Sequence, residues 1–135
     1  MHSRRLLAAL KAINDEQLKS AVAIPQIVSM SMESFSKWWE GIGEELKHEP
    51  RRDVALLKLD ERDRMADAYY AVSWAMVYFM LRSEPAYADV LKEYFIQESR
   101  GQGSVNTFDI LLKGRTGEST ERFQEKFHSY IRALK

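Results

Sequence analysis

The sequence has 135 residues, of which 45% are hydrophobic and 30% charged, a length and balance that suit one compact domain. Lys and Arg together number 20, as do Asp and Glu, so the formal net charge is zero. Proteins that bind nucleic acid or anionic membranes through a broad surface field need a basic excess, which is missing here. Cysteine is absent, which excludes disulfides, thiolate metal sites and a cysteine nucleophile.

The apolar stretches are too short for a membrane or export role. The most apolar window, residues 71–81, falls short of the ~20 residues of a membrane-spanning helix. The apolar run that follows Arg5 ends at Lys11, which is shorter than the ~7–15 residues of a signal-peptide core. We therefore expect no signal peptide in this chain and no membrane partner, and an exported parent protein would carry its signal upstream.

The first part of the chain predicts three helical segments. An apolar repeat on one face indicates a helix over residues 3–13, and Asn14 with Asp15 favours a turn after it. Pro25 suits the first turn of a short second helix, because its missing N–H costs little there. Ser31 is the expected N-cap of a longer third helix. The apolar positions of that third helix are Met32, Phe35, Trp38, Trp39, Ile42 and Leu46.

The middle of the chain contrasts a polar stretch with an apolar one. Residues 47–64 mix both signs of charge around Pro50, which favours a solvated polar loop with a short apolar anchor. Residues 61–83 show the clearest helical pattern, with apolar side chains on most faces. A helix of this kind lies at the centre of a domain, so Trp74 is expected to be buried and Trp74→Ala to cost ~3–5 kcal/mol of stability.

Three further helices are expected after the central one. Pro85 begins the first of them, residues 99–104 form a loop, and Gly114 is expected to close a short helix around Phe108. The last helix carries a clean stripe formed by Phe123, Phe127, Tyr130, Ile131 and Leu134. No stretch alternates with period two. The sequence therefore predicts an all-α fold, a compact bundle of five to seven helices in a single helical domain over residues 1–135.

The histidines give no support for a metal centre. His48 and Glu49 begin like the zinc-protease motif HExxH, but a proline follows them and Arg52 replaces the second histidine. His2 and His128 lie on separate terminal segments. Since a catalytic zinc site needs about three protein ligands, we expect this chain to hold no zinc or other cofactor.

The string Trp38–Gly41 has more than one interpretation. An adjacent tryptophan pair is found in carbohydrate-binding surfaces, and the string is similar to a W-x-x-E-G motif with a metal-ligand glutamate. Core packing of the two rings on one helix is the simpler expectation. The acidic residues Glu40, Glu44 and Glu45 are expected to face solvent, because neighbours on one helix do not converge across a cleft.

Two segments together carry a family resemblance. Residues 24–35 read IPQIVSMSMESF and residues 70–81 read YAVSWAMVYFML, followed by a helix, a glycine-containing loop and a closing FxxxFxxYI helix. This order, over residues 20–134, resembles the C-terminal helical portion of bacterial peptidase MA-like domains, which are related to the gluzincin zinc metallopeptidases. The HExxH segment is lacking, and the string at residues 38–41 follows the IPxI segment, whereas in the family it precedes it.

The resemblance implies a part of a larger protein. It implies a helical subdomain of a zinc-metallopeptidase-like protein, non-catalytic as it stands, that contributes a cleft wall and contacts to substrate or partner. Zinc would then belong to an intact parent. In related gluzincins a tyrosine at the start of the helix after the active site stabilises the oxyanion, and Tyr70 resembles it. In the alternative, Tyr70 packs at a helix start and its hydroxyl finds a nearby acceptor.

Two other functions compete with the peptidase interpretation. The first is a stand-alone helical protein–protein interaction module without enzymatic activity, and the second is a small-ligand binder that uses the aromatics around Trp74. The expected partner is a protein or peptide, or the missing catalytic segment. A homodimer with Tyr69 or Tyr70 at the contact is also expected, since zero net charge offers little repulsion. In the monomeric alternative, the loop at residues 47–64 folds over that face.

Overall fold

The structure is a computed structural model that describes residues 3–30 and 32–134, and it describes no side chain at residues 3, 32–36 and 38. The helices are α1 (Ser3–Asn14), α2 (Ile24–Ser29), α3 (Met32–Lys47), α4 (Arg52–Arg82), α5 (Pro85–Ser99), α6 (Val105–Thr116) and α7 (Thr120–Ala133). The described residues include no strand, and none of their helices is both long and apolar enough to cross a bilayer. The predicted all-α fold of five to seven helices is confirmed.

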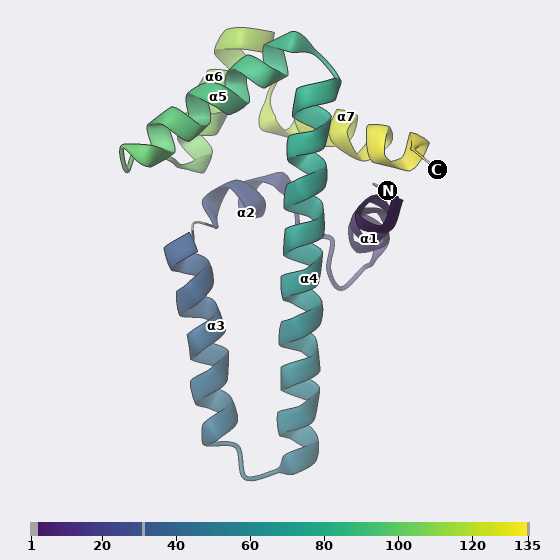
Figure 1. Cartoon of the computed structure of the whole chain (residues 1–135), viewed down its shortest axis with the longest axis vertical. Coiled ribbons are helices and arrows are strands. Elements are labelled where there is room, and N and C mark those ends of the chain that lie inside the picture. The colour runs from purple at the N-terminus through teal and green to yellow at the C-terminus, as the bar shows by residue number, and fades with distance from the viewer. Residues whose placement is uncertain (1–2, 31, 135) are drawn as a thin grey trace.

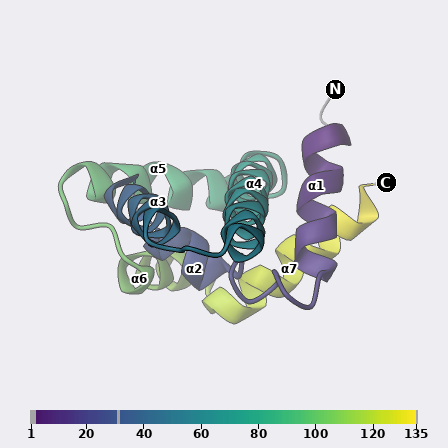
Figure 2. The ribbon, with the colours of Figure 1, turned by 90° about the horizontal axis from the view of Figure 1, so that it is seen from below.

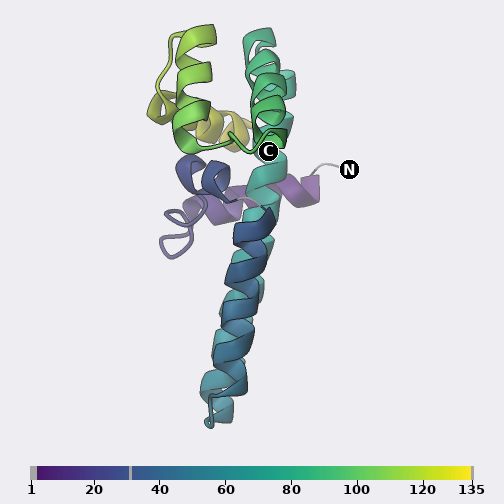
Figure 3. The same ribbon diagram turned by 90° about the vertical axis from the view of Figure 1, so that its left-hand side faces the viewer.

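The molecule consists of a head and a projecting hairpin, which share α4 (Figure 1). We call residues 3–30 and 65–134 the head, and residues 32–64 the hairpin. In the hairpin, α3 and the first half of α4 run antiparallel, and they extend well beyond the other helices (Figure 3). The second half of α4 enters the head, where α1 and α5 lie on opposite sides of it (Figure 2).

The expectation of a polar loop over residues 47–64 is wrong. Only residues 48–51 connect α3 to α4, and the chain is helical from Arg52 onwards. Arg, Lys, Glu, Leu and Ala all have good intrinsic helix propensity, so a charged stretch is compatible with a helix that has few neighbours. Pro50 lies in the connection, where it interrupts no helix.

The core of the head is built around the second half of α4. Phe79 is fully buried and contacts four aromatic rings from α5 and α7, with centroids 5.1–5.6 Å from its own. These rings belong to Tyr87, Phe123, Phe127 and Tyr130. Contacts in this range add to the free energy gained from burial. The expected central apolar helix is therefore present, and its apolar faces are covered mainly from residue 66 onwards.

The polar groups at the end of α2 are satisfied by two tyrosines. Tyr69 Oη donates to the carbonyl oxygen of Met30 (2.8 Å), and Tyr94 Oη donates to that of Val28 (3.2 Å). Burial raises the pKa of both phenols, that of Tyr94 to about 12, so they remain protonated donors. These bonds fix the point from which the hairpin begins. Ser31, the expected N-cap of α3, lies outside the described residues.

The end of α6 differs from the expectation. Gly114 lies inside α6, and the helix is closed by Gly117, whose φ of 74° is left-handed. A glycine is favoured at this position because a Cβ atom is strained in the left-handed region. Ser119 then caps α7, where its side chain accepts a hydrogen bond from the backbone N–H of Arg122 (3.1 Å).

Candidate functional site

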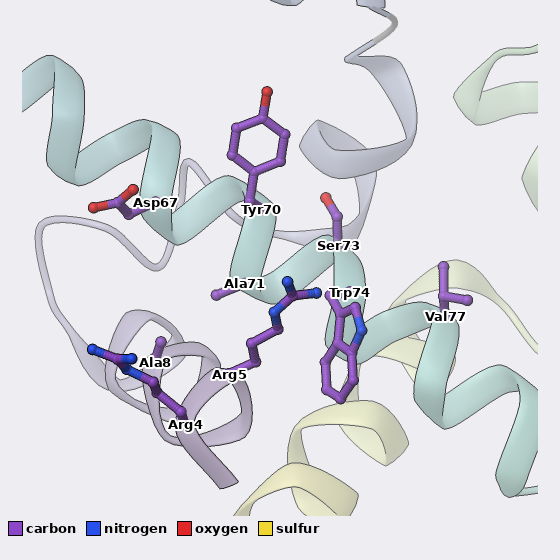
Figure 4. A pocket seen from close by; sticks show the side chains of 9 residues that line it. All are labelled: Arg4, Arg5, Ala8, Asp67, Tyr70, Ala71, Ser73, Trp74 and Val77. Atoms are coloured by element: carbon purple, nitrogen blue, oxygen red, sulfur yellow. The ribbon is translucent and has the colours of Figure 1, made fainter. Parts of the chain in front are cut away.

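An open hollow of about 640 Å³ lies between α1 and α4 (Figure 4). We call it the α1–α4 hollow. Two arginines and an alanine on α1 face a row of α4 side chains across it. Its lining residues are Arg4, Arg5, Ala8, Asp67, Tyr70, Ala71, Ser73, Trp74 and Val77.

The hollow follows from the side-chain sizes where the two helices meet. α1 buries Leu6, Ala9 and Ile13 in the head, so it is fixed against its neighbours on that face. Beside this contact, Ala8 on α1 and Ala71 on α4 present only methyl groups to the hollow. Small residues between larger ones leave a groove where two helices pack. The hollow therefore results from the small side chains that α1 and α4 both place at this contact.

Trp74 is a wall of the hollow and is only partly buried. Its indole stacks on Tyr78 with ring centroids 5.3 Å apart, and the Arg5 guanidinium lies 5.7 Å from its ring centroid. Trp74 packs against the core as a partly buried residue, so the expected burial is only partial. Periodicity shows that α4 is apolar on most sides, but it does not show which side the neighbouring helices leave uncovered.

Tyr70 stands at the rim of the hollow with 54% of its surface exposed. Its ring makes an edge contact with Tyr69, at a centroid distance of 5.8 Å. Tyr69 packs against the core of the head, and its hydroxyl donates to the carbonyl oxygen of Met30. Because α4 begins at Arg52, Tyr70 lies in the middle of the helix, so its expected place at a helix start is wrong, and the oxyanion role stays a prediction.

The charges at the hollow are unevenly distributed. Arg4 and Arg5 are exposed, lie in the first turn of α1, and have no acidic residue beside them in that turn. Asp67 is the one acidic residue among the described lining residues. The hollow thus has a positive edge on α1 and an aromatic wall on α4.

The described histidines lie apart from one another. No group of three His, Asp or Glu side chains in the described part of the chain is placed to hold a metal ion. The side chain of His48 is 83% exposed at the end of the hairpin, whereas His128 is partly buried on α7. Burial lowers the pKa of His128. His2 lies outside the described residues.

The string at residues 38–41 lies in the hairpin, away from the hollow. Trp39 packs under Arg62, whose guanidinium lies 3.6 Å from its ring centroid. The side chain of Trp38 lies outside the described residues. Glu40, Glu44 and Glu45 are exposed, which confirms that these carboxylates face solvent.

A polar cluster in the head was not found from the sequence. Tyr87 Oη donates to Glu118, and Lys126 Nζ donates to both Glu118 (3.0 Å) and Glu84 (2.7 Å). Burial raises the pKa of Tyr87 to about 12. Burial acts to raise the pKa of Glu118, but hydrogen bonds from Tyr87 and Lys126 hold it below its usual value. These groups satisfy one another and join α5 to α7, so we interpret the cluster as structural.

Comparisons with protein-family models, with curated proteins and with solved structures found no match. The fold defines a class of protein only at the level of its architecture, an all-α domain with a projecting helical hairpin. Within it, the α1–α4 hollow combines an exposed aromatic, a partly buried tryptophan and two arginines. A functional argument can be built on these features.

Proposed function

We propose that this chain is a non-catalytic helical domain that binds a polypeptide in the α1–α4 hollow. The observation that supports it most strongly is the position of Tyr70, half-exposed beside Trp74 at the rim of a concave surface. Tyr, Trp and Arg are the residue types that most often dominate the energy of protein interfaces. All three types line this hollow.

A polypeptide fits the hollow better than a small ligand does. Small-molecule sites enclose most of the ligand surface. Tyr70 and Asp67, which both line the α1–α4 hollow, are exposed, so the hollow is open to solvent at these residues. A chain segment can place one or two side chains in such a hollow and continue across its rim.

The polypeptide has two proposed sources. In the first, it is a segment of a larger zinc-metallopeptidase-like protein, and α4 forms a wall of its cleft. The exposure of Tyr70 supports this proposal, because a tyrosine that acts on a second segment must be reachable from outside its own domain. In the second, the domain is an interaction module and the segment belongs to a separate protein or to a second copy of this chain.

Selection from a random peptide library tests the proposal. Peptides enriched on the wild-type domain would be synthesised and their affinities measured for three proteins, the wild type, Tyr70→Ser and Phe95→Ser. Phe95 is the matched control, because it is 55% exposed and lies on α5, on the far side of α4 from α1. We expect Tyr70→Ser to weaken binding about tenfold or more, and Phe95→Ser to leave it unchanged. Equal affinities for all three proteins, or no enriched peptide, would overturn the proposal.

Sedimentation equilibrium over a concentration series shows whether the bound polypeptide is a second copy of this chain or comes from one of the other proposed sources. If the hollow binds a second copy, the wild type forms dimers and Tyr70→Ser remains monomeric at the same concentrations. Residues 47–64 do not fold over this face, because they form the end of α3, the connection and the start of α4, and they extend away from the head. The expected cover by a loop is therefore wrong, and the oligomeric state stays to be measured. A monomeric wild type would exclude the homodimer and leave a different polypeptide as the ligand.

A further inference from the structure

We infer that the α1–α4 hollow selects acidic peptides, in which a carboxylate contacts Arg5 at the positive edge that it forms with Arg4, and an adjacent apolar side chain packs beside Trp74. This inference rests on the proposed function, since it specifies the chemistry of the polypeptide that the hollow binds. The charges and ring contacts at the α1 edge of the hollow support this inference.

The two arginines are not paired with an acidic residue in the described part of the chain. Neither Arg4 nor Arg5 forms an ion pair or side-chain hydrogen bond with another described residue, and both are exposed. They also lie in the first turn of α1, where the helix dipole disfavours cations and favours anions. A carboxylate bound at Arg5 would therefore interact favourably with its guanidinium group and with the start of the helix, and Arg4 would add positive charge to the same edge.

Arg5 is held in a position that suits carboxylate recognition. It extends from α1 toward the face of Trp74, with its guanidinium 5.7 Å from the ring centroid (Figure 4). A guanidinium that stacks on an aromatic face keeps the N–H groups at its edge available, and these match the two oxygens of a carboxylate. Contact with the indole also reduces the freedom that the side chain loses on binding.

Apolar surface lies directly beside this positive edge. Ala8, Ala71 and Val77 contribute the aliphatic part of the lining; the two alanines lie on one side of Arg5, and Trp74 and then Val77 lie on its other side. A side chain next to the carboxylate can cover this surface. The hollow thus fits a carboxylate and an apolar group that are close neighbours in one segment.

Asp67 determines where along the hollow the carboxylate binds. It is exposed among the lining residues and would repel an acidic group placed next to it. The acidic group of the ligand is therefore directed to Arg5 and Trp74. An oligonucleotide, with a phosphate at every step, would meet this repulsion, and the zero net charge of the chain supplies no general attraction for it.

The test compares charge variants of both partners by fluorescence polarisation. The probe is the peptide most enriched in the library selection, together with analogues in which each Asp or Glu is replaced by Asn or Gln. We expect the neutral analogue to bind about tenfold more weakly, and the double variant Arg4→Gln/Arg5→Gln to lose a similar factor for the acidic peptide only. Higher salt should weaken binding of the acidic peptide more than that of its analogue.

The matched control is Arg51→Gln/Arg52→Gln, which removes two adjacent arginines at the start of α4, at the far end of the hairpin. It changes the net charge equally, so unchanged affinity in this variant assigns the effect to the hollow. Enriched peptides that depend on Tyr70 but tolerate neutral analogues would overturn this inference and leave the proposed function intact. If no enriched peptide depends on Tyr70 for binding, both this inference and the proposed function are overturned. Equal or tighter Tyr70-dependent binding of a short oligothymidylate would overturn the acidic-peptide inference in favour of single-stranded nucleic acid.

Discussion

Helix α4 passes through two regions that stabilise it in different ways. In the head it is covered by α1, α5 and α7, and Phe79 lies inside a cluster of aromatic rings. In the hairpin, α3 is the one described helix that lies beside it, and Leu56 and Leu57 are more than half exposed. In the head, burial on several sides stabilises α4. In the hairpin, it is stabilised mainly by contacts with α3.

The hairpin relies on contacts between individual side chains. Arg62 lies over Trp39, and near the turn Glu49 pairs with Arg51 (2.9 Å) and Lys58 (3.7 Å). The Arg51 hydrogen bond lowers the pKa of Glu49. Exposed ion pairs contribute little to folding stability. The comparison therefore teaches that one continuous helix can have a stable half and a weak half, and we expect the hairpin to open at a lower free energy than the head.

The largest difference in the free energy of unfolding should appear between two side-chain truncations on α4. Phe79→Ala removes a fully buried ring from the head and should lower the free energy of unfolding by ~3–5 kcal/mol. Leu57→Ala removes a side chain that is 65% exposed and should cost less than ~0.5 kcal/mol. Urea denaturation followed by circular dichroism measures both. Similar losses for the two variants would contradict the division into head and hairpin.

The cluster around Glu118 should make the head sensitive to acid. Its folded pKa lies below the unfolded value of ~4.3, so Glu118 stabilises the fold above that pH, and this contribution disappears as the pH falls through the folded pKa. We expect Glu118→Gln to cost ~1–2 kcal/mol at pH 7, and its stability to converge with that of the wild type as the pH falls through the lowered folded pKa of Glu118. Denaturant unfolding across a pH series measures this.

The control for the acid prediction is Glu125→Gln. Glu125 is exposed and pairs with Arg122 on the surface of α7 (3.2 Å). A surface pair of this kind contributes little, so this variant should follow the wild-type curve at every pH. A Glu118→Gln curve that stays parallel to the wild-type curve down to low pH would show that the carboxylate charge is not what stabilises the cluster.

Trp74→Ala tests an intermediate case within the head. The ring is partly buried at the wall of the α1–α4 hollow, so its removal should cost about 1–2 kcal/mol, less than Phe79→Ala on the same helix. The same urea titration gives both values. A loss as large as that of Phe79→Ala would mean that Trp74 belongs to the closed core, as its sequence pattern alone suggests.

The sequence predicts the helices better than it predicts their surroundings. Pro25 and Pro85 each lie in the first turn of a helix, where the missing N–H is tolerated. The sequence does not predict the helix over residues 52–60, because its charged residues have no apolar stripe wide enough to reveal a partner. Gly114 and Gly117 are both glycines near the end of α6, and only the fold decides which of them becomes left-handed.

The candidate site could be predicted only in part. Tyr70 was singled out from its sequence, and its catalytic role remains a prediction. The hollow beside it depends on Ala8 and Ala71, which carry no chemical signal and lie far apart in the chain. Their meeting depends on how α1 packs on α4, and this long-range contact is not encoded in any local pattern.

The smallest expected effect is a change in hydrogen exchange in the hairpin, and it tests whether the hairpin opens separately from the head. Arg62→Ala removes the guanidinium over Trp39 and the aliphatic stem that packs with it, a contact of about 1 kcal/mol at a partly exposed site. We expect hydrogen exchange at backbone amides of α3 and the start of α4 to accelerate by up to about tenfold, since 1.4 kcal/mol corresponds to a factor of ten. Amides around Phe79 should exchange at the wild-type rate.

Arg64→Ala is the matched control, because Arg64 lies two residues further along α4 and bonds Gln17 of the head (3.1 Å) rather than a residue of α3. It removes the same charge and a similar stem, so hairpin exchange should remain unchanged if the Trp39 contact is responsible. Acceleration of the α3 amides in both variants would assign the effect to charge. Equal acceleration of hairpin and head amides in Arg62→Ala would show that the two halves of α4 unfold as one unit, because a local contact can affect distant amides only through global unfolding.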